Sequence, residues 1–518
     1  MVFRLPGTKW PFSAGRHGMA MLALVAALTL GAAHAAPFGT ITMATPLDLT
    51  TLDGSQNVSG WHRWVYRNLY DPLITRDGKG QLRPALAERW ERIDNVTWRL
   101  HLRAGVTFHN GEVFDANAVR YTLQQTKQPK AQSRGAFVLL TDAKVVDART
   151  VDIITDGPLA YLPDVIADTF FPVPPKYHAE ATLEGFAVKP VGTGAYRFVS
   201  WRRGDRITLE ANPSWWGGVP KADKLVFWVI PDASTRVSAM LNGEATLAAQ
   251  IPPLEADRFK GSQAARVEAS KAGIQPIWGG LMYDRPVFAD KRVREAVNLA
   301  INRQAIVDRL LRGYGKPTGQ LCTSDMPCYD PSISPFPYNP ERARQLLKEA
   351  GVQDLTLRLT APQGPVPQAA ELTQIIAADL KRVGITTKIE IYEAAIYSQK
   401  LYDFKNQQKE LGDIFLYFFK SGPGSETTMR SLTDSQGSWN WSHYKNAQLD
   451  ELWKQVRSTF DDGKRAELMR QISALLRADI GWLFLFEPFS LWAVSNKASW
   501  QVRPDDLINV QDIELRTN

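Results

Sequence analysis

Cysteine is almost absent from this sequence, and so are the short motifs that mark most hydrolases and nucleotide-binding enzymes. The 518 residues include two cysteines and seven histidines. No H-E-x-x-H motif and no close histidine pair occurs, which argues against a zinc hydrolase. A G-x-S-x-G elbow and a Walker A loop are also missing. The carboxylates are numerous, but their context marks none as a catalytic pair, so we expect a protein that is not an enzyme.

A basic cluster and a long apolar run are also missing. The formal net charge is +7, and the positive residues are spread along the chain, which argues against a nucleic-acid partner. The apolar stretch Met19–Leu30 is shorter than the ~20 residues that cross a bilayer, so it should not persist as an anchor. No cysteine follows it, which argues against a lipid-anchored protein.

This N-terminal stretch is typical of an export signal. Arg4, Lys9 and Arg16 precede the apolar run, and the small-x-small sequence Ala33-His34-Ala35 follows it. The order predicts cleavage after about Ala35 and a periplasmic location. Cleavage removes three basic and no acidic residues, which lowers the formal charge from +7 to +4.

The two cysteines lie close together in the sequence CTSDMPC. Cys322 and Cys328 occupy a turn-rich segment. In an oxidising compartment such a pair forms a local disulfide. A zinc site would require a tighter cysteine spacing and a second pair of ligands, and the sequence has neither. We therefore predict the disulfide and no metal.

Length and pattern predict a chain of more than one α/β domain. A chain of 518 residues is too long for one core, and strands alternate with helices along it. Aromatic residues make up 10% of the chain, including 16 tryptophans, so some ring surface is available for a ligand pocket, although most rings should fill cores. The expected strands are 39–44, 96–102, 279–284, 355–360 and 386–392. The expected helices start or lie at 61, 115, 293–301, 302–311, 340–351, 370–383, 449–453 and 465–476, and the closing stretch 482–494 is apolar and aromatic.

The stretch from Leu86 to Val119 carries the most specific pattern. We expect a short helix at Leu86–Trp90, an alternating strand at 96–102, a turn at Asn110–Glu112 and a helix capped by Asp115. The core Leu102-Arg103-Ala104-Gly105-Val106-Thr107-Phe108-His109-Asn110-Gly111 closely resembles the signature of the peptide- and nickel-binding family of periplasmic solute-binding proteins, which serve ABC importers.

A second stretch, Pro190-Val191-Gly192-Thr193-Gly194-Ala195-Tyr196, resembles that family's turn before a strand. We expect its two glycines, Gly192 and Gly194, to adopt positive φ angles. A nucleotide loop is rejected because the full G-x-G-x-x-G is absent and a strand follows.

The resemblance covers the mature chain and implies an α/β fold of the type II periplasmic binding protein kind. Two lobes joined by a hinge are expected, with an extra subdomain in the first lobe. The implied boundaries are a signal peptide at 1–35, lobe I at 36–281 with its subdomain at about 66–190, lobe II at 282–487, and a return to lobe I at 488–518. The ligand would lie between the lobes.

The loop at Phe415–Glu426 departs from the peptide-binding members. Those proteins place an Asp there that pairs with the α-ammonium group of a peptide, whereas this chain has Gly424 at or near that position. Either Glu426 replaces the Asp, or the ligand carries no free amine. Lys420 would suit an anionic ligand in the second case.

The other ligand contacts are implied by position in the family. Trp439 and Asn440 match a phrase that lines the cleft from lobe II, and Arg134 matches an Arg that receives a ligand carboxylate in nickel-chelate members. The second Arg expected near Phe170–Pro172 for a metal chelate is missing. The predicted site is completed by aromatic walls and polar anchors: Trp61, Phe418, Phe419 and Trp439, with Arg134, Asn440 and Glu426.

The expected function is capture of a peptide or peptide-like molecule by a monomer, without cofactor, and delivery to a permease in the inner membrane. The alternative is a non-peptide ligand, such as a metal chelate, an opine or another small organic anion, for the same kind of importer. A periplasmic hydrolase remains a third hypothesis, because catalytic triads assemble from residues far apart in sequence.

Overall fold

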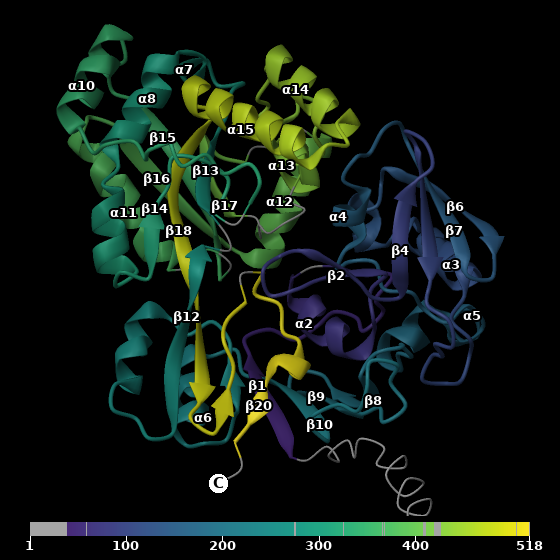
Figure 1. Ribbon diagram of the computed structural model, residues 1–518. Coiled ribbons are helices and arrows are strands. Elements are labelled where there is room, and N and C mark those ends of the chain that lie inside the picture. Colours follow the sequence, from purple (N-terminus) through teal and green to yellow (C-terminus); the bar gives the residue numbers. More distant parts are fainter. Residues whose placement is uncertain are drawn as a thin grey trace, which may run out of the picture.

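Figure 1 shows the computed structural model of the chain, in which two α/β bodies lie one above the other and a smaller β-rich body lies beside them. The structure describes residues 39–516, except 59, 274–275, 325, 365, 367, 408–410, 419–425 and 504. The predicted signal peptide at 1–35 therefore lies outside the described residues, as do Phe419, Lys420 and Gly424. Within the described part, no helix is both long and apolar enough to cross a membrane.

The helices are α2 (Gly60–Leu69), α3 (Ala116–Thr126), α4 (Leu162–Ile166), α5 (Pro175–Val188), α6 (Ala233–Leu241), α7 (Pro286–Ala289), α8 (Lys291–Ala300), α9 (Arg303–Ala305), α10 (Pro340–Glu349), α11 (Ala369–Arg382), α12 (Ala394–Gln407), α13 (Glu426–Thr433), α14 (Ala447–Ser458) and α15 (Asp462–Asp479). Shorter helical turns are η1 (Gln132–Gly135), η2 (Pro253–Phe259), η3 (Ile306–Leu310) and η4 (Val510–Asp512).

The strands are β1 (Thr40–Thr45), β2 (Ile74–Arg76), β3 (Leu82–Pro84), β4 (Ala87–Arg92), β5 (Thr97–Leu102), β6 (Leu140–Asp147), β7 (Thr150–Thr155), β8 (Tyr196–Arg202), β9 (Arg206–Ala211), β10 (Lys224–Val229), β11 (Leu247–Ala248), β12 (Ala265–Gly273), β13 (Ile277–Leu281), β14 (Gly315–Pro317), β15 (Thr356–Gln363), β16 (Thr386–Glu393), β17 (Ile414–Phe418), β18 (Trp482–Ser495), β19 (Ala498–Ser499) and β20 (Glu514–Leu515).

The long strand β18 connects the two larger bodies, which we call lobe I and lobe II. Its second half pairs with β11 and β12 in lobe I, and its first half pairs with β13 in lobe II. The sheet runs in the order β16-β15-β17-β13-β18-β11-β1-β10-β9-β8. The sequence of β18 is almost continuously apolar, as expected for a strand that is covered on both faces.

Lobe I contains β1, parallel to β10, with the antiparallel strands β9 and β8 beyond it. Helix α2 packs against this sheet and buries Trp64, Val65 and Tyr66. Lobe II contains the parallel pairs β15–β16 and β15–β17. Helices α8, α10 and α11 lie around that sheet in Figure 1.

The third body is a four-stranded antiparallel sheet, β4-β5-β7-β6, accompanied by α3 and α4; we call it the subdomain. Its apolar core is continuous with that of lobe II, because one cluster of buried side chains contains both Leu100 of β5 and Trp453 of α14. The subdomain is therefore packed against lobe II as well as attached to lobe I.

The expected helix at Leu86–Trp90 is wrong, because this segment forms strand β4. Ala87 pairs with Leu102, and Trp90 pairs with Leu100 of β5. The residues Ala, Glu and Arg favour a helix locally. Hydrogen bonding to the neighbouring strand β5, together with the half-burial of Trp90, outweighs that small preference.

The expected positive φ angles at Gly192 and Gly194 are also wrong. Neither glycine is among the residues with positive φ. Glycine is required at both positions because the backbone of Leu69 lies too close to leave room for a Cβ. A Cβ on Gly192 would lie 2.0 Å from the carbonyl oxygen of Leu69, and one on Gly194 would lie 2.6 Å from the Leu69 carbonyl carbon. Only glycine lets this turn pack so closely against the end of α2.

The predicted helix caps and the disulfide are confirmed. Asp115 accepts hydrogen bonds from the backbone N–H groups of Asn117 and Ala118. Asn302 and Asn339 cap their helices in the same way. Cys322 and Cys328 form a disulfide that is buried in lobe II.

Candidate functional site

Six aromatic rings form a continuous array in lobe II, and its members come from β13, β17 and the loop after α13. Trp278 lies opposite Tyr417 in the β13–β17 register. Ring centroids are 5.8 Å apart for Trp278 and Tyr417, 4.8 Å for Tyr417 and Trp441, and 6.2 Å for Trp441 and Trp439. Phe418 stacks on Tyr417 at 5.3 Å. The remaining member, Phe415, contacts Trp278 and Trp441.

The rings of this array differ in exposure, and Trp439 at its outer end is the most exposed of the six. Trp278 is 1% exposed, Trp441 is 7% exposed and Trp439 is 42% exposed. Tyr417 and Phe418 are half-buried. The inner rings therefore act as core, and the outer end presents an aromatic surface that can contact a ligand. Of the predicted aromatic residues, the structure thus brings Phe418 and Trp439 together, whereas Phe419 lies outside the described residues.

Asn440 shapes the loop that carries Trp439. Its side-chain nitrogen donates to the carbonyl oxygens of Tyr444 at 2.7 Å and Asp434 at 3.1 Å. Its side-chain oxygen accepts from the Tyr444 backbone N–H at 3.1 Å and from the Ser442 hydroxyl at 3.3 Å. These four bonds use the ordinary capacity of an amide. Asn440 is 2% exposed, so its contacts assign it to loop geometry, and its predicted ligand contact stays a prediction.

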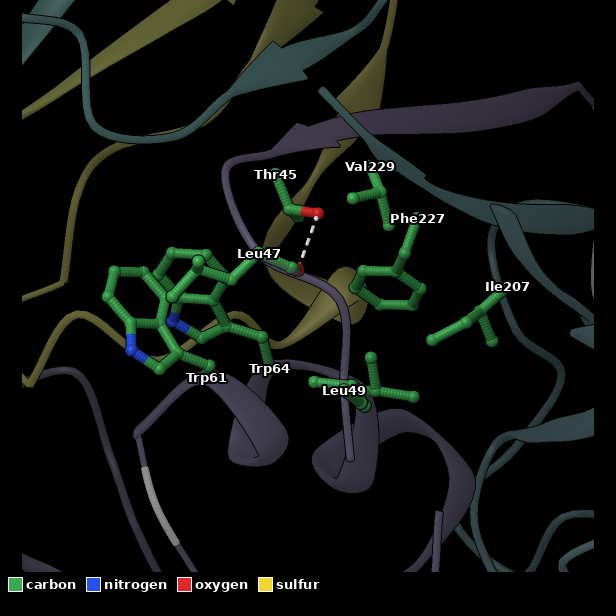
Figure 2. A pocket seen from close by; sticks show the side chains of 9 residues that line it. Thr45, Leu47, Leu49, Trp61, Trp64, Ile207, Phe227 and Val229 are labelled. Carbon is green, nitrogen blue, oxygen red and sulfur yellow. Dashed lines mark hydrogen bonds between the residues drawn. The ribbon is translucent and has the colours of Figure 1, made fainter. Parts of the chain in front are cut away.

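Trp61, the predicted lobe I wall, stands in the first turn of α2 at a small apolar pocket. Figure 2 shows Trp61 and Trp64 on one side of this pocket and Phe227 and Ile207 on the other. The two indole rings meet edge to face with centroids 4.8 Å apart. Further lining residues are Thr45, Leu47, Leu49, Val65 and Val229. The ends of the parallel strands β1 and β10 thus supply part of the lining, a usual place for ligands in α/β sheets.

The loop that leads into α2 is held by buried hydrogen bonds. The side chain of Asp53 accepts from the Ser55 hydroxyl at 2.7 Å and lies 2.9 Å from Nε2 of His178. The Tyr121 hydroxyl lies 2.9 Å from Nδ1 of the same His178 ring. Tyr66 donates to the carbonyl oxygen of Asp53 at 3.0 Å. This network, which the sequence did not reveal, fixes the approach to Trp61.

Arg134 lies in η1, next to this loop. The neighbouring Ser133 donates its hydroxyl to the carbonyl oxygen of Ser55 at 2.6 Å, and its backbone N–H donates to the carbonyl oxygen of Gln56 at 3.0 Å. Arg134 itself is exposed. The segments that carry Trp61 and Arg134 are therefore adjacent in lobe I, and the guanidinium is accessible to an anionic group.

Glu426 begins α13 and is 2% exposed. Burial, together with the nearby charge of Asp164 from α4, raises the pKa of Glu426 to about 7. The guanidinium groups of Arg465 and Arg76 oppose this rise. Glu426 thus lies where lobe II meets the subdomain, and not at the open end of the aromatic array.

The contact between lobe II and the subdomain was another feature the sequence did not reveal. The carbonyl oxygen of Arg457 accepts a hydrogen bond from Ala160 at 2.8 Å, and its guanidinium donates to Pro158. Phe460 contacts Trp98 of β5 and lies 4.1 Å from the guanidinium carbon of Arg92. These residues are separated by about 300 to 370 positions in sequence, and no local pattern signals their pairing. Among the described residues, no group of three His, Cys, Asp or Glu side chains is arranged to hold a metal ion.

Comparisons with known proteins agree with this architecture. Residues 81–441 match the family model for bacterial extracellular solute-binding proteins, family 5. The chain is 28% identical over 441 residues to the dipeptide-binding protein of Escherichia coli K12, which covers 79% of this chain and 81% of that one. It is 26% identical over 514 residues to the glutathione-binding protein GsiB of Shigella dysenteriae serotype 1, covering 97% and 99% of the two chains.

Solved structures share the fold. The periplasmic binding protein DppA from Helicobacter pylori, in complex with the peptide STSA, superposes with a TM-score of 0.80 at 22% identity and covers 93% of this chain and 99% of that one. The binding protein MoaA from A. tumefacien R10, in complex with mannopinic acid, has a TM-score of 0.78 at 23% identity and covers 93% and 100%. These likenesses confirm the type II periplasmic binding protein fold. The chain belongs to family 5 of the bacterial extracellular solute-binding proteins.

Proposed function

We propose that this protein captures a peptide or peptide-like molecule in the periplasm and delivers it to the permease of an ABC importer. The observation that carries this proposal is the lobe II aromatic array, whose outer member, Trp439, is 42% exposed while Trp278, Phe415 and Trp441 are buried. Such a surface contacts a solute without breaking bonds in it, so we propose binding alone and no catalysis. Two curated relatives bind a dipeptide and glutathione.

Each predicted residue has a part in this proposal. Trp61, Phe418 and Trp439 supply aromatic walls, and Arg134 receives a carboxylate of the ligand through paired N–H donors. Asn440 holds the loop of Trp439. A role for Phe419 stays a prediction.

Ligand capture is proposed to use the connection through β12–β13 and β18 as a hinge. Strand β13 pairs within lobe II, so we place the first crossing between Gly273 and Ile277, slightly before the 36–281 boundary expected from sequence. The return crossing lies near Pro488, where β18 changes its partner from β14 to β12. Closure of the lobes buries the ligand and produces the shape that a permease recognises. Export with cleavage after Ala35 and a monomeric state are further parts of the proposal.

A second candidate is a non-peptide ligand such as an opine or another small organic anion. It is favoured by the sequence at Gly424, which lacks the Asp that pairs with a peptide ammonium in the family. MoaA, which has a similar fold, is in complex with mannopinic acid.

Native mass spectrometry of protein purified without denaturation tests both candidates. We expect the released material to contain a series of peptide masses. A single non-peptide species would establish the second candidate and contradict the first. If the purified protein carries no ligand, a thermal-shift panel of dipeptides, tripeptides, glutathione and opines distinguishes the two candidates.

A further inference from the structure

Lobe II and the subdomain enclose a cluster of charged side chains around Glu426, which we call the interlobe cluster. From the subdomain side, Asp164 pairs with Arg76 at 2.6 Å. From lobe II, Arg465 reaches Asp164 at 4.0 Å. In Figure 1, α4 lies on the side of the subdomain nearest to α13. The cluster consists of Arg76, Tyr161, Asp164, Glu426, Arg430 and Arg465.

Three buried polar atoms in this cluster have no hydrogen bond of good geometry to a described residue, although the Arg430 side chain is close enough to the Tyr161 hydroxyl to donate to it. They are Oε2 of Glu426, Nε of Arg430 and the hydroxyl of Tyr161. Glu426 and Arg430 are four residues apart on α13, so they lie on one face of that helix. The Arg430 guanidinium and the Glu426 carboxyl both influence the pKa of Tyr161, which places all three groups together. A buried polar atom without a partner needs an explanation, and a bound polar group is one of them.

The chemistry of these groups selects the ligand. Arg430 and Tyr161 offer an N–H and an O–H, and a protonated Glu426 offers a second O–H. The pKa of Glu426 is raised to about 7, so a large fraction of the carboxyl is protonated at neutral pH. Around it stand three guanidinium groups, Arg76, Arg430 and Arg465. The acidic partners are Asp164, Asp434 at 3.8 Å from Arg430, and Asp462 at 2.7 Å from Arg465.

With Glu426 neutral, the charges of those three pairs balance, and the unused hydrogen atoms of Arg430, Tyr161 and Glu426 require an acceptor. A ligand ammonium would leave the Arg430 and Tyr161 hydrogen atoms without acceptors and would add positive charge beside three guanidinium groups. A carboxylate oxygen accepts from all three donors.

We propose that the interlobe cluster binds a carboxylate of the ligand through Arg430, Tyr161 and Glu426; Arg134 receives a second carboxylate in ligands that carry two. This inference rests on the proposed function and assigns Glu426 the role of donor instead of partner to an amine. A ligand carboxylate that joins lobe II to the subdomain also stabilises their contact, which couples ligand recognition to closure.

Binding of three probes distinguishes the two roles of Glu426. Tri-alanine, its N-acetyl form and its C-terminal amide are titrated calorimetrically into the wild type, Glu426→Gln and Arg430→Gln. We expect the amide to bind about 10- to 100-fold more weakly than the acid, the usual effect of losing hydrogen bonds to a charged group. Acetylation should matter little, and Glu426→Gln should keep its affinity because Gln retains an N–H donor. Arg430→Gln should bind acid and amide equally.

The pH dependence of ligand affinity supplies a second readout, which would not change if Glu426 had only a structural role. Affinity of the wild type for tri-alanine should fall by up to about tenfold per pH unit above about pH 7, because binding requires the proton on Glu426. Glu426→Gln should show no such slope. Arg470→Gln, on the exposed face of α15, is the matched control for loss of an arginine.

The proposal is overturned if the amide binds as tightly as the acid, or if acetylation and Glu426→Gln each abolish binding, which would make Glu426 the partner of an ammonium. If none of the peptides binds, the proposal that the ligand is a peptide is refuted, and binding of a simple carboxylate then tests the interlobe cluster. Succinate, compared with chloride at the same ionic strength, should raise the melting temperature of the wild type but not of Arg430→Gln. Equal shifts in the melting temperatures of the wild type and Arg430→Gln would overturn the proposal.

Discussion

The two proposed walls of the site are built by different physical means. In lobe I, the approach to Trp61 is held by a buried polar network of Asp53, His178 and Tyr121. In lobe II, Trp439 is held by ring packing that continues inward to Trp278. A polar network depends on geometry and protonation, whereas packed rings depend on volume and buried area. The two walls should therefore respond to different perturbations.

Loss of an inner ring should give the largest effect on stability. Trp441→Ala removes a ring that is 7% exposed and contacts three members of the array. We expect a loss of about 3–5 kcal/mol in the free energy of unfolding, as for other large-to-small core changes. Chemical denaturation measures it. A loss below about 1 kcal/mol would show that the array is not a packed core.

Acidification should act on lobe I. Burial lowers the pKa of His62, on α2 beside Thr50, to about 4. The unfolded chain binds a proton on this ring below about pH 6.5 and the folded protein does not, so stability should fall as the pH drops from 6.5 to 4, by up to about 3 kcal/mol.

Urea titrations of the wild type and His62→Gln across that range measure this loss. The variant should show a shallower decline. Parallel profiles would assign the acid sensitivity elsewhere, for example to His109, whose pKa burial also lowers to about 4.

Removal of the Asn440 amide should have an intermediate effect. Asn440→Ala leaves the carbonyl oxygens of Tyr444 and Asp434 and the Tyr444 backbone N–H without this partner. We expect a loss of about 1–3 kcal/mol in unfolding free energy and weaker ligand binding, because the loop of Trp439 loosens. Asn440→Asp, which keeps the acceptor, is the control. Weaker binding at unchanged stability would instead indicate direct ligand contact.

The exposed end of the array should matter least for stability. Trp439→Ala removes a ring that is 42% exposed, so the unfolding free energy should change by about 1 kcal/mol or less. Ligand affinity should nevertheless fall at least about tenfold, as expected for a buried aromatic contact in the complex. Thermal unfolding and calorimetric titration together measure this separation, and an affinity equal to that of the wild type would remove Trp439 from the site.

Much of the fold follows from local patterns, and the exceptions have physical causes. Strand β5, the caps at Asp115 and Asn339 and the disulfide each depend on nearby residues, so the sequence predicts them. Strand β4 was mistaken for a helix because its conformation is set by pairing with β5. The contacts of Arg457 and Glu426 with the subdomain join distant segments, and no spacing reveals them.

The site divides in the same way. Trp439 and Trp61 were predicted because they occupy recognisable positions in a family pattern, and their ligand contacts stay predictions. Trp441 and Tyr417 were missed as parts of one array, although the spacing Trp439-Asn440-Trp441 was a visible signal. The loop-forming role of Asn440 was not foreseen from sequence, since only the structure shows that its amide bonds to its own loop; its predicted ligand contact stays a prediction.

The most direct test of solute capture is the melting temperature of the wild type and Trp439→Ala with tripeptides and glutathione. At about 100 times its dissociation constant, a ligand should raise the unfolding free energy of the wild type by about 2.7 kcal/mol. The variant should show little increase at that concentration. Equal stabilisation of both proteins would contradict the proposed site, and no stabilisation by any peptide would contradict peptide capture.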